Sequence, residues 1–80
     1  MKHYRKLPVV IEAEQFTGDE TQAKRLGLTR QMTAAGGMAW FVATLEGAMI
    51  VNPGAWVIIG IKGEKYPCAD DVFKRTYEPA

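Results

Sequence analysis

Hydrophobic and polar residues alternate most clearly near the start of the chain, in the stretch PVVIEAEQF at residues 8–16. Successive side chains of a β-strand point to opposite faces, so a period of two indicates a strand with one wet face. The predicted faces hold Val9, Ile11 and Ala13 on one side, and Val10, Glu12 and Glu14 on the other. The pattern therefore predicts a strand near a sheet edge, with a proline at its start.

Helix signals follow this strand. Thr17 and Glu20 stand at capping-box spacing, in which the Thr17 hydroxyl accepts from the backbone N–H of Glu20 and the Glu20 carboxylate reaches back. We expect a short helix near residues 19–27, with Gly27 just past its end. Residues 28–38 fit either an extension of that helix or a loop, and two glycines end whichever of the two forms.

Four apolar stretches separated by tight turns then predict a meander of about four strands. These stretches are MAWFVATL, AMIV, WVIIGI and EKYPC, between residues 38 and 68. Pro53 and Gly54 occupy the two central positions of a turn and suit type II, because proline presets φ and glycine accepts a positive φ. WVIIGI is apolar on both faces, which favours a central strand, and Gly60 within it indicates a bulge or a close backbone approach.

The chain ends in a predicted short helix near residues 70–76, with Asp70 as its N-cap and Val72, Phe73 and Tyr77 on one face. The expected fold class is therefore α+β. We expect residues 1–80 to form a single domain, built on one twisted antiparallel sheet of about 4–5 strands. An SH3-like, partly open barrel is one form that such a sheet can take.

Composition narrows the function classes. The 80 residues are 48% hydrophobic and 24% charged, with a formal net charge of +1, which is typical of a globular domain and makes direct nucleic-acid binding an unfavoured expectation. The basic residues cluster at the start, and we expect residues 1–7 to be mobile. We expect neither a signal peptide nor a membrane span, and a single cysteine fits a reducing cytoplasm.

Catalytic and metal chemistry find little support. A thiol nucleophile at Cys68 would need His3, the one histidine, beside it, and the role that the sequence favours for the thiol is that of a small hydrophobic side chain. One His and one Cys are too few for a typical zinc site. Four carboxylates have structural alternatives in turns or caps, namely Glu46, Glu64, Asp70 and Asp71. The sequence therefore predicts a protein that is not an enzyme and holds no metal or cofactor.

Binding residues are easier to nominate. Lys62 and Lys65 next to Tyr66 could meet an anionic ligand, although a lysine at a strand edge more often keeps that edge soluble. Arg30 is a further candidate cation for the same ligand. Trp40 and Trp56 fit either a sheet core or an exposed aromatic platform for a partner. These six residues are the predicted binding candidates.

The stretches YRKLPVVIEAEQFTGD and LEGAMIVNPGAWVIIGIKGEKYPCADDVFKRTYE resemble a family of short proteins encoded by tailed phages and prophages. The family pattern is a Pro-Gly-Asp-aromatic turn, a Lys-Gly-Glu turn, Tyr-Pro-Cys, and a closing Phe and Tyr-Glu. The resemblance covers residues 4–19 and 45–78, which is roughly two-thirds of the chain. It departs at Ala55, where the family has Asp, so any role of that carboxylate is absent.

The resemblance implies an accessory protein that acts in the host cytoplasm, and it supplies no catalytic residues. Our first hypothesis is a non-enzymatic protein that binds and interferes with a host protein, such as a bacterial immune complex of the CRISPR–Cas kind. The alternative is a homo-oligomer that sequesters an anionic nucleotide between basic and aromatic side chains. A short chain has a thin core, which makes self-association reasonable.

Overall fold

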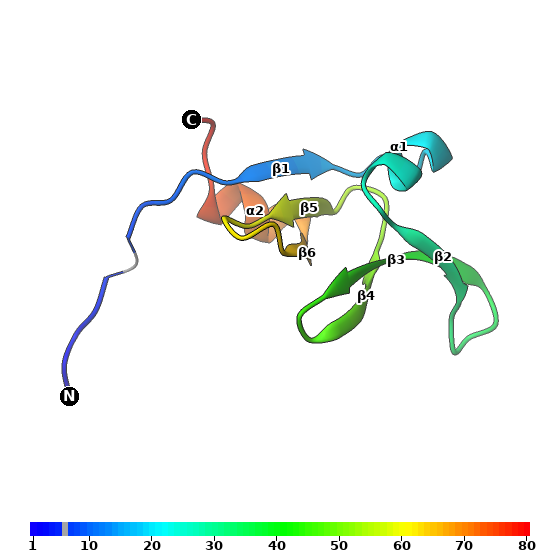
Figure 1. The fold of residues 1–80 in the computed structure, drawn as a ribbon, viewed down its shortest axis with the longest axis horizontal. Coiled ribbons are helices and arrows are strands. Elements are labelled where there is room, and N and C mark those ends of the chain that lie inside the picture. Colours follow the sequence, from blue (N-terminus) through cyan, green and yellow to red (C-terminus); the bar gives the residue numbers. More distant parts are fainter. Residues whose placement is uncertain (6) are drawn as a thin grey trace.

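The computed structural model of the protein describes residues 1–5 and 7–80. The elements follow one another as six strands and two helices (Figure 1). They are β1 (Glu12–Gln15), α1 (Glu20–Arg25), β2 (Thr29–Met32), β3 (Met38–Thr44), β4 (Gly47–Val51), β5 (Trp56–Ile59), β6 (Lys65–Cys68) and α2 (Asp70–Thr76). The α+β class is confirmed.

The strands form two antiparallel three-stranded sheets, in the orders β1-β5-β6 and β2-β3-β4. The prediction of one sheet with 4–5 strands is wrong, and the strands do not make a clear SH3-like barrel. Strand β6 lies near β3 and β4, but the described residues of these strands share no ladder there. The strand that was not predicted is β2, which comes from residues 28–38, the stretch whose sequence fitted a longer helix or a loop. It is a strand because β3 pairs with it, with Thr29 opposite Phe41 and Met32 opposite Met38.

A small core fills the space between α1 and the two sheets. Its central residue is Phe16, which is fully buried just after β1. Packed around it are Ala23, Leu26, Leu28, Val42, Val51 and Val57, with Trp40 and Ala55 partly buried at the margin. The backbone of Phe16 bonds to the turn before β5, since its N–H donates to Ala55 and its carbonyl accepts from Gly54. The core therefore joins β1, the turn and α1 in one packed unit.

Both helix starts differ from the predicted caps. The N-cap of α1 is Asp19, whose carboxylate accepts the backbone N–H of Gln22 at 2.9 Å. The expected Thr17–Glu20 capping box is wrong, because Thr17 instead donates its N–H and its hydroxyl to the side-chain oxygen of Gln22. The N-cap of α2 is Ala69 rather than Asp70, which is the first helical residue.

The predicted turn at Pro53 and Gly54 is confirmed, and the first predicted strand forms in part. Ala55 donates its N–H to the Asn52 carbonyl at 3.0 Å and Gly54 has φ +95°, as a type II turn requires. Gly60 does not lie inside the strand as expected but follows the end of β5, where a side chain in its place would meet the Glu64 carboxylate rather than a neighbouring backbone. Strand β1 is shorter than predicted, because residues 8–11 lie outside it. In the predicted basic start, residues 1–5 are exposed and Lys6 lies outside the described residues.

Candidate binding grooves

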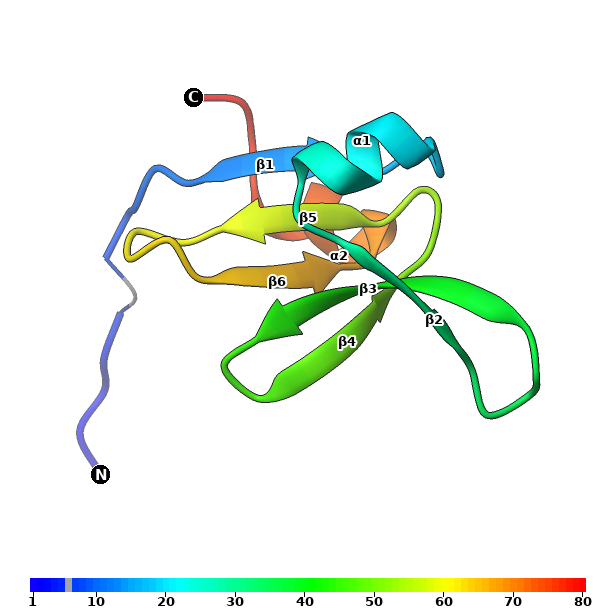
Figure 2. The ribbon, with the colours of Figure 1, turned by 45° about the vertical axis from the view of Figure 1, so that its right-hand side comes forward.

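Helix α2 covers the face of the β1-β5-β6 sheet that lies opposite the core (Figure 2). Trp56 on β5 stacks on Phe73 of α2, with ring centroids 4.0 Å apart and planes at 6°. The Phe73 ring in turn lies 5.1 Å from the ring of Tyr77, one helical turn further on. These three rings form a continuous aromatic row. The predicted helix face of Val72, Phe73 and Tyr77 is wrong, because Tyr77 is the C-cap of α2 with an extended backbone and Val72 is 44% exposed.

Asp70 holds the start of α2 against this row. Its Oδ1 accepts the indole N–H of Trp56 at 2.9 Å and the side-chain amide of Gln15 at 3.3 Å. Its Oδ2 lies 3.1 Å from the Lys74 ammonium. The hydrogen bond from Trp56, followed by that from Lys74, lowers the pKa of Asp70. This carboxylate is therefore charged and engaged in positioning the helix.

A groove of about 790 Å³ runs along the aromatic row, between α2 and the start of β1. We call it the aromatic groove. Its lining is mostly apolar: Pro8, Val9, Val10, Ile11, Ala13, Trp56, Phe73, Lys74, Tyr77, Glu78, Pro79 and Ala80. Val10 is 77% exposed here, so a large apolar side chain stands in solvent at the rim. Such exposed apolar clusters commonly mark binding surfaces.

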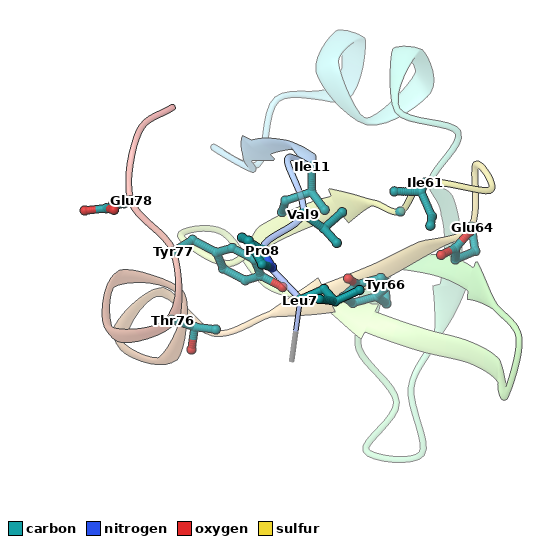
Figure 3. A pocket seen from close by; sticks show the side chains of 11 residues that line it. Leu7, Pro8, Val9, Ile11, Ile61, Glu64, Tyr66, Thr76, Tyr77 and Glu78 are labelled. Carbon is teal, nitrogen blue, oxygen red and sulfur yellow. The ribbon is translucent and has the colours of Figure 1, made fainter. Parts of the chain in front are cut away.

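A second groove of about 460 Å³ lies on the other side of Tyr77, and we call it the tyrosine groove (Figure 3). The two grooves are adjacent and share five lining residues, namely Pro8, Val9, Ile11, Tyr77 and Glu78. The remaining lining residues of the tyrosine groove are Leu7, Gly60, Ile61, Glu64, Tyr66 and Thr76. Leu7 and Ile61 are 78% and 74% exposed, so this groove too presents apolar side chains to solvent.

Burial raises the pKa of Tyr66, and the neighbouring Tyr77 hydroxyl adds to the effect. Burial also raises the pKa of the half-buried Cys68 thiol, and the charge of Asp71 contributes to that shift. A raised pKa keeps a thiol protonated at neutral pH, whereas a nucleophilic cysteine needs the thiolate. The environment of Cys68 therefore opposes nucleophilic chemistry.

Three of the four candidate carboxylates, Glu64, Asp70 and Asp71, have structural partners. Glu64 accepts the backbone N–H of Lys62 at 3.0 Å in the β5–β6 turn. Asp71 pairs with Arg75 across one turn of α2, at 3.6 Å. Within residues 1–5 and 7–80, no three His, Cys, Asp or Glu side chains gather where a metal ion could bind.

The predicted binding residues divide between different parts of the molecule. Trp56 and Tyr66 lie on the groove side, where Tyr66 lines the tyrosine groove. Lys65 is the neighbour of Tyr66 on β6 and points to the other face, where its ammonium donates to the Leu26 carbonyl at 2.7 Å. Lys62 is exposed in the β5–β6 turn.

Arg30 and Trp40 are cross-strand partners in the other sheet, and Trp40 packs at the margin of the core. Within one chain, the three candidate cations therefore do not converge on the aromatic row. The sequence reasoning nominated only Trp56 and Tyr66 of the groove lining, and the residues it missed include Leu7, Val10, Ile61 and Tyr77. Leu7, Val10 and Ile61 are apolar positions bordering a turn or a strand, a signal too weak to separate them from core residues.

Comparison of the chain with models of protein families, with curated proteins and with solved structures gave no match. Among the described residues, no helix is long and apolar enough to cross a membrane.

Proposed function

We propose that the protein is a non-enzymatic binding module that receives an apolar segment of another protein in the aromatic and tyrosine grooves. The observation that supports this is the pair of adjacent apolar grooves, which share Tyr77 as a wall and are rimmed by exposed Leu7, Val10 and Ile61. Aromatic side chains that line a groove give large contact area at low entropic cost, which suits protein recognition.

The resemblance to phage proteins extends this proposal to a bacterial host protein, including a subunit of an immune complex, as the partner. The nucleotide alternative receives less support from the grooves. Their ionisable side chains include Glu64 and Glu78, whose charge would repel an anion, and one candidate lysine, Lys65, is already bound to a carbonyl.

A pull-down from bacterial lysate tests the proposal with two matched variants. Ile61→Glu places a charge in the tyrosine groove, and Leu45→Glu places the same charge at an 89% exposed position in the β3–β4 turn, away from both grooves. We expect the parent chain and Leu45→Glu to capture the same protein in stoichiometric amount, and Ile61→Glu to lose it. Both side chains are exposed, so both variants should fold, which circular dichroism checks.

Equal capture by all three chains would show that the grooves are not the binding surface. A chain that captures no protein but melts at a higher temperature with an added nucleotide would support the small-molecule alternative instead, because a ligand that binds the folded state raises its stability.

A further inference from the structure

The β2-β3-β4 sheet has a second face that no described element covers. Strand register places Thr29, Gln31, Ala39, Phe41, Ala43, Ala48 and Ile50 on this face. We call it the outer face, because the alternate residues Val42 and Val51 are buried in the core. The β2–β3 hairpin of this sheet extends away from α2 and from the chain start, whereas the β3–β4 turn points back toward the side on which the chain start lies (Figures 1 and 2).

The composition of β3 is that of a strand buried on both sides. Its sequence MAWFVAT holds apolar residues at consecutive positions, whereas a strand with one wet face alternates. The inner face is covered only where it meets the core, since Val42 is 1% exposed while Met32, Met38 and Met49 on that face are 71%, 52% and 42% exposed. On the outer face, the neighbouring Ala43 is exposed. Ile50, the cross-strand partner of Phe41, is 42% exposed. The outer face thus presents uncharged and mostly apolar side chains to solvent.

We propose that the outer face is a self-association surface, on which a second copy of this chain packs sheet against sheet across a twofold axis. The absence of charge argues for a second copy over another protein. All seven residues of this face are uncharged at neutral pH. In a twofold interface the same patch meets itself, so a charge near the axis would face a like charge.

The shapes of the side chains fit the same arrangement. Ala39, Ala43 and Ala48 are small enough to let two sheets approach to the roughly 10 Å of face-to-face packing. Phe41 and Ile50 would interdigitate with the partner as the larger anchors.

The surface area of the chain is also high for a monomer. A folded monomer of 8.9 kDa is expected to expose about 4,800 Å². This chain exposes 6351 Å², with the extended start contributing part of the difference. A standard interface removes roughly 800 Å² from each partner.

Sedimentation equilibrium across a wide range of protein concentration tests the proposal. We expect the parent chain to reach twice the 8.9 kDa mass of the chain and its melting temperature to rise with concentration. Ala43→Glu should weaken association on the order of a hundredfold, because like charges would meet. Ala35→Glu is the matched control, since it changes an exposed alanine in the β2–β3 turn, and it should remain dimeric.

Ile50→Lys serves as the second variant, with the opposite charge, should Ala43→Glu fail to give a native circular dichroism spectrum. A parent chain that stays monomeric at every concentration, or a folded Ala43→Glu that stays dimeric, would overturn the proposal. If the parent is monomeric and Ala43→Glu loses a captured protein, the outer face binds another protein and the proposed dimer is excluded. The groove variant Ile61→Glu should leave the mass unchanged, so this test is separate from that of the grooves.

Discussion

The two helices cover opposite faces of the β1-β5-β6 sheet and are held there by different means (Figure 2). Helix α1 buries Ala23 and is followed by the buried Leu26, both packed on Phe16. Helix α2 buries none of its residues 70–76 and contacts the sheet through the aromatic row and Asp70. The face toward α1 therefore holds the main core, while the face toward α2 buries Ile58 of β5 and leaves apolar groove surface exposed.

Polar contacts reinforce the contrast. Gln22 of α1 joins the helix to β1, because its side-chain amide donates to the Gln15 carbonyl at 2.8 Å and to the Glu14 carboxylate at 2.6 Å. Both terminal nitrogens of the Arg25 guanidinium donate to the same Glu14 carboxylate, Nη1 at 2.9 Å. The ion pairs of α2 run mainly within the helix, from Asp70 to Lys74 and from Asp71 to Arg75. Local opening should therefore begin at α2.

The largest effect is expected on the α1 side. Phe16→Ala removes a fully buried ring and should cost about 3–5 kcal/mol, against a total of about 4–12 kcal/mol for a domain of this size. Urea denaturation measures the loss, with the exposed Leu45→Ala as the control that should change little. A loss below that of Phe73→Ala would contradict the assignment of the stabilising face.

An intermediate effect is expected for Phe73→Ala, which removes the middle ring of the aromatic row. The half-buried side chain and its stacking should together contribute about 1–2 kcal/mol. Hydrogen exchange should speed up chiefly for the amides of Phe73 and Tyr77, which bond to Ala69 and Phe73 within α2. Val72→Ala alters an exposed residue of the same helix and should leave these amides protected. Faster exchange throughout the core would show that α2 is part of the stabilising unit.

The sequence predicted the elements whose signals are local. The type II turn at Gly54 and the short helix near residues 70–76 were both predictable, because each depends on residues a few positions apart. Strand β2 was not, since all four of its residues are exposed and its extended form comes from pairing with β3. The predicted capping box of α1 did not form because Thr17 donates to the Gln22 side chain instead, a choice that spacing alone does not reveal.

The grooves could not be predicted from local sequence signals, for a different reason. Trp56 and Tyr66 were predicted as binding residues and do lie on the groove side, since aromatic residues at strand positions are visible in any sequence. The grooves themselves need residues 7–11, Ile61 and Tyr77 to meet from three distant segments. Likewise, the side chains of Lys65 and Tyr66 point to opposite faces of one sheet, and which face each takes depends on the register of β6, which the sequence does not show.

The smallest of the three effects, and the one most specific to α1, should appear in acid. The hydrogen bond from Arg25, followed by that from Gln22, lowers the pKa of Glu14 from 4.5 to about 2. A carboxylate with a lowered folded-state pKa contributes stability that is fully present above pH 4.5 and is lost as the pH falls through about 2. Glu14→Gln should therefore flatten the pH dependence of the unfolding free energy between these values. Glu20→Gln removes the more exposed pair with Lys24 on the same helix and should keep that dependence. Identical acid profiles for the parent chain and Glu14→Gln would show that the contacts between β1 and α1 do not stabilise this face.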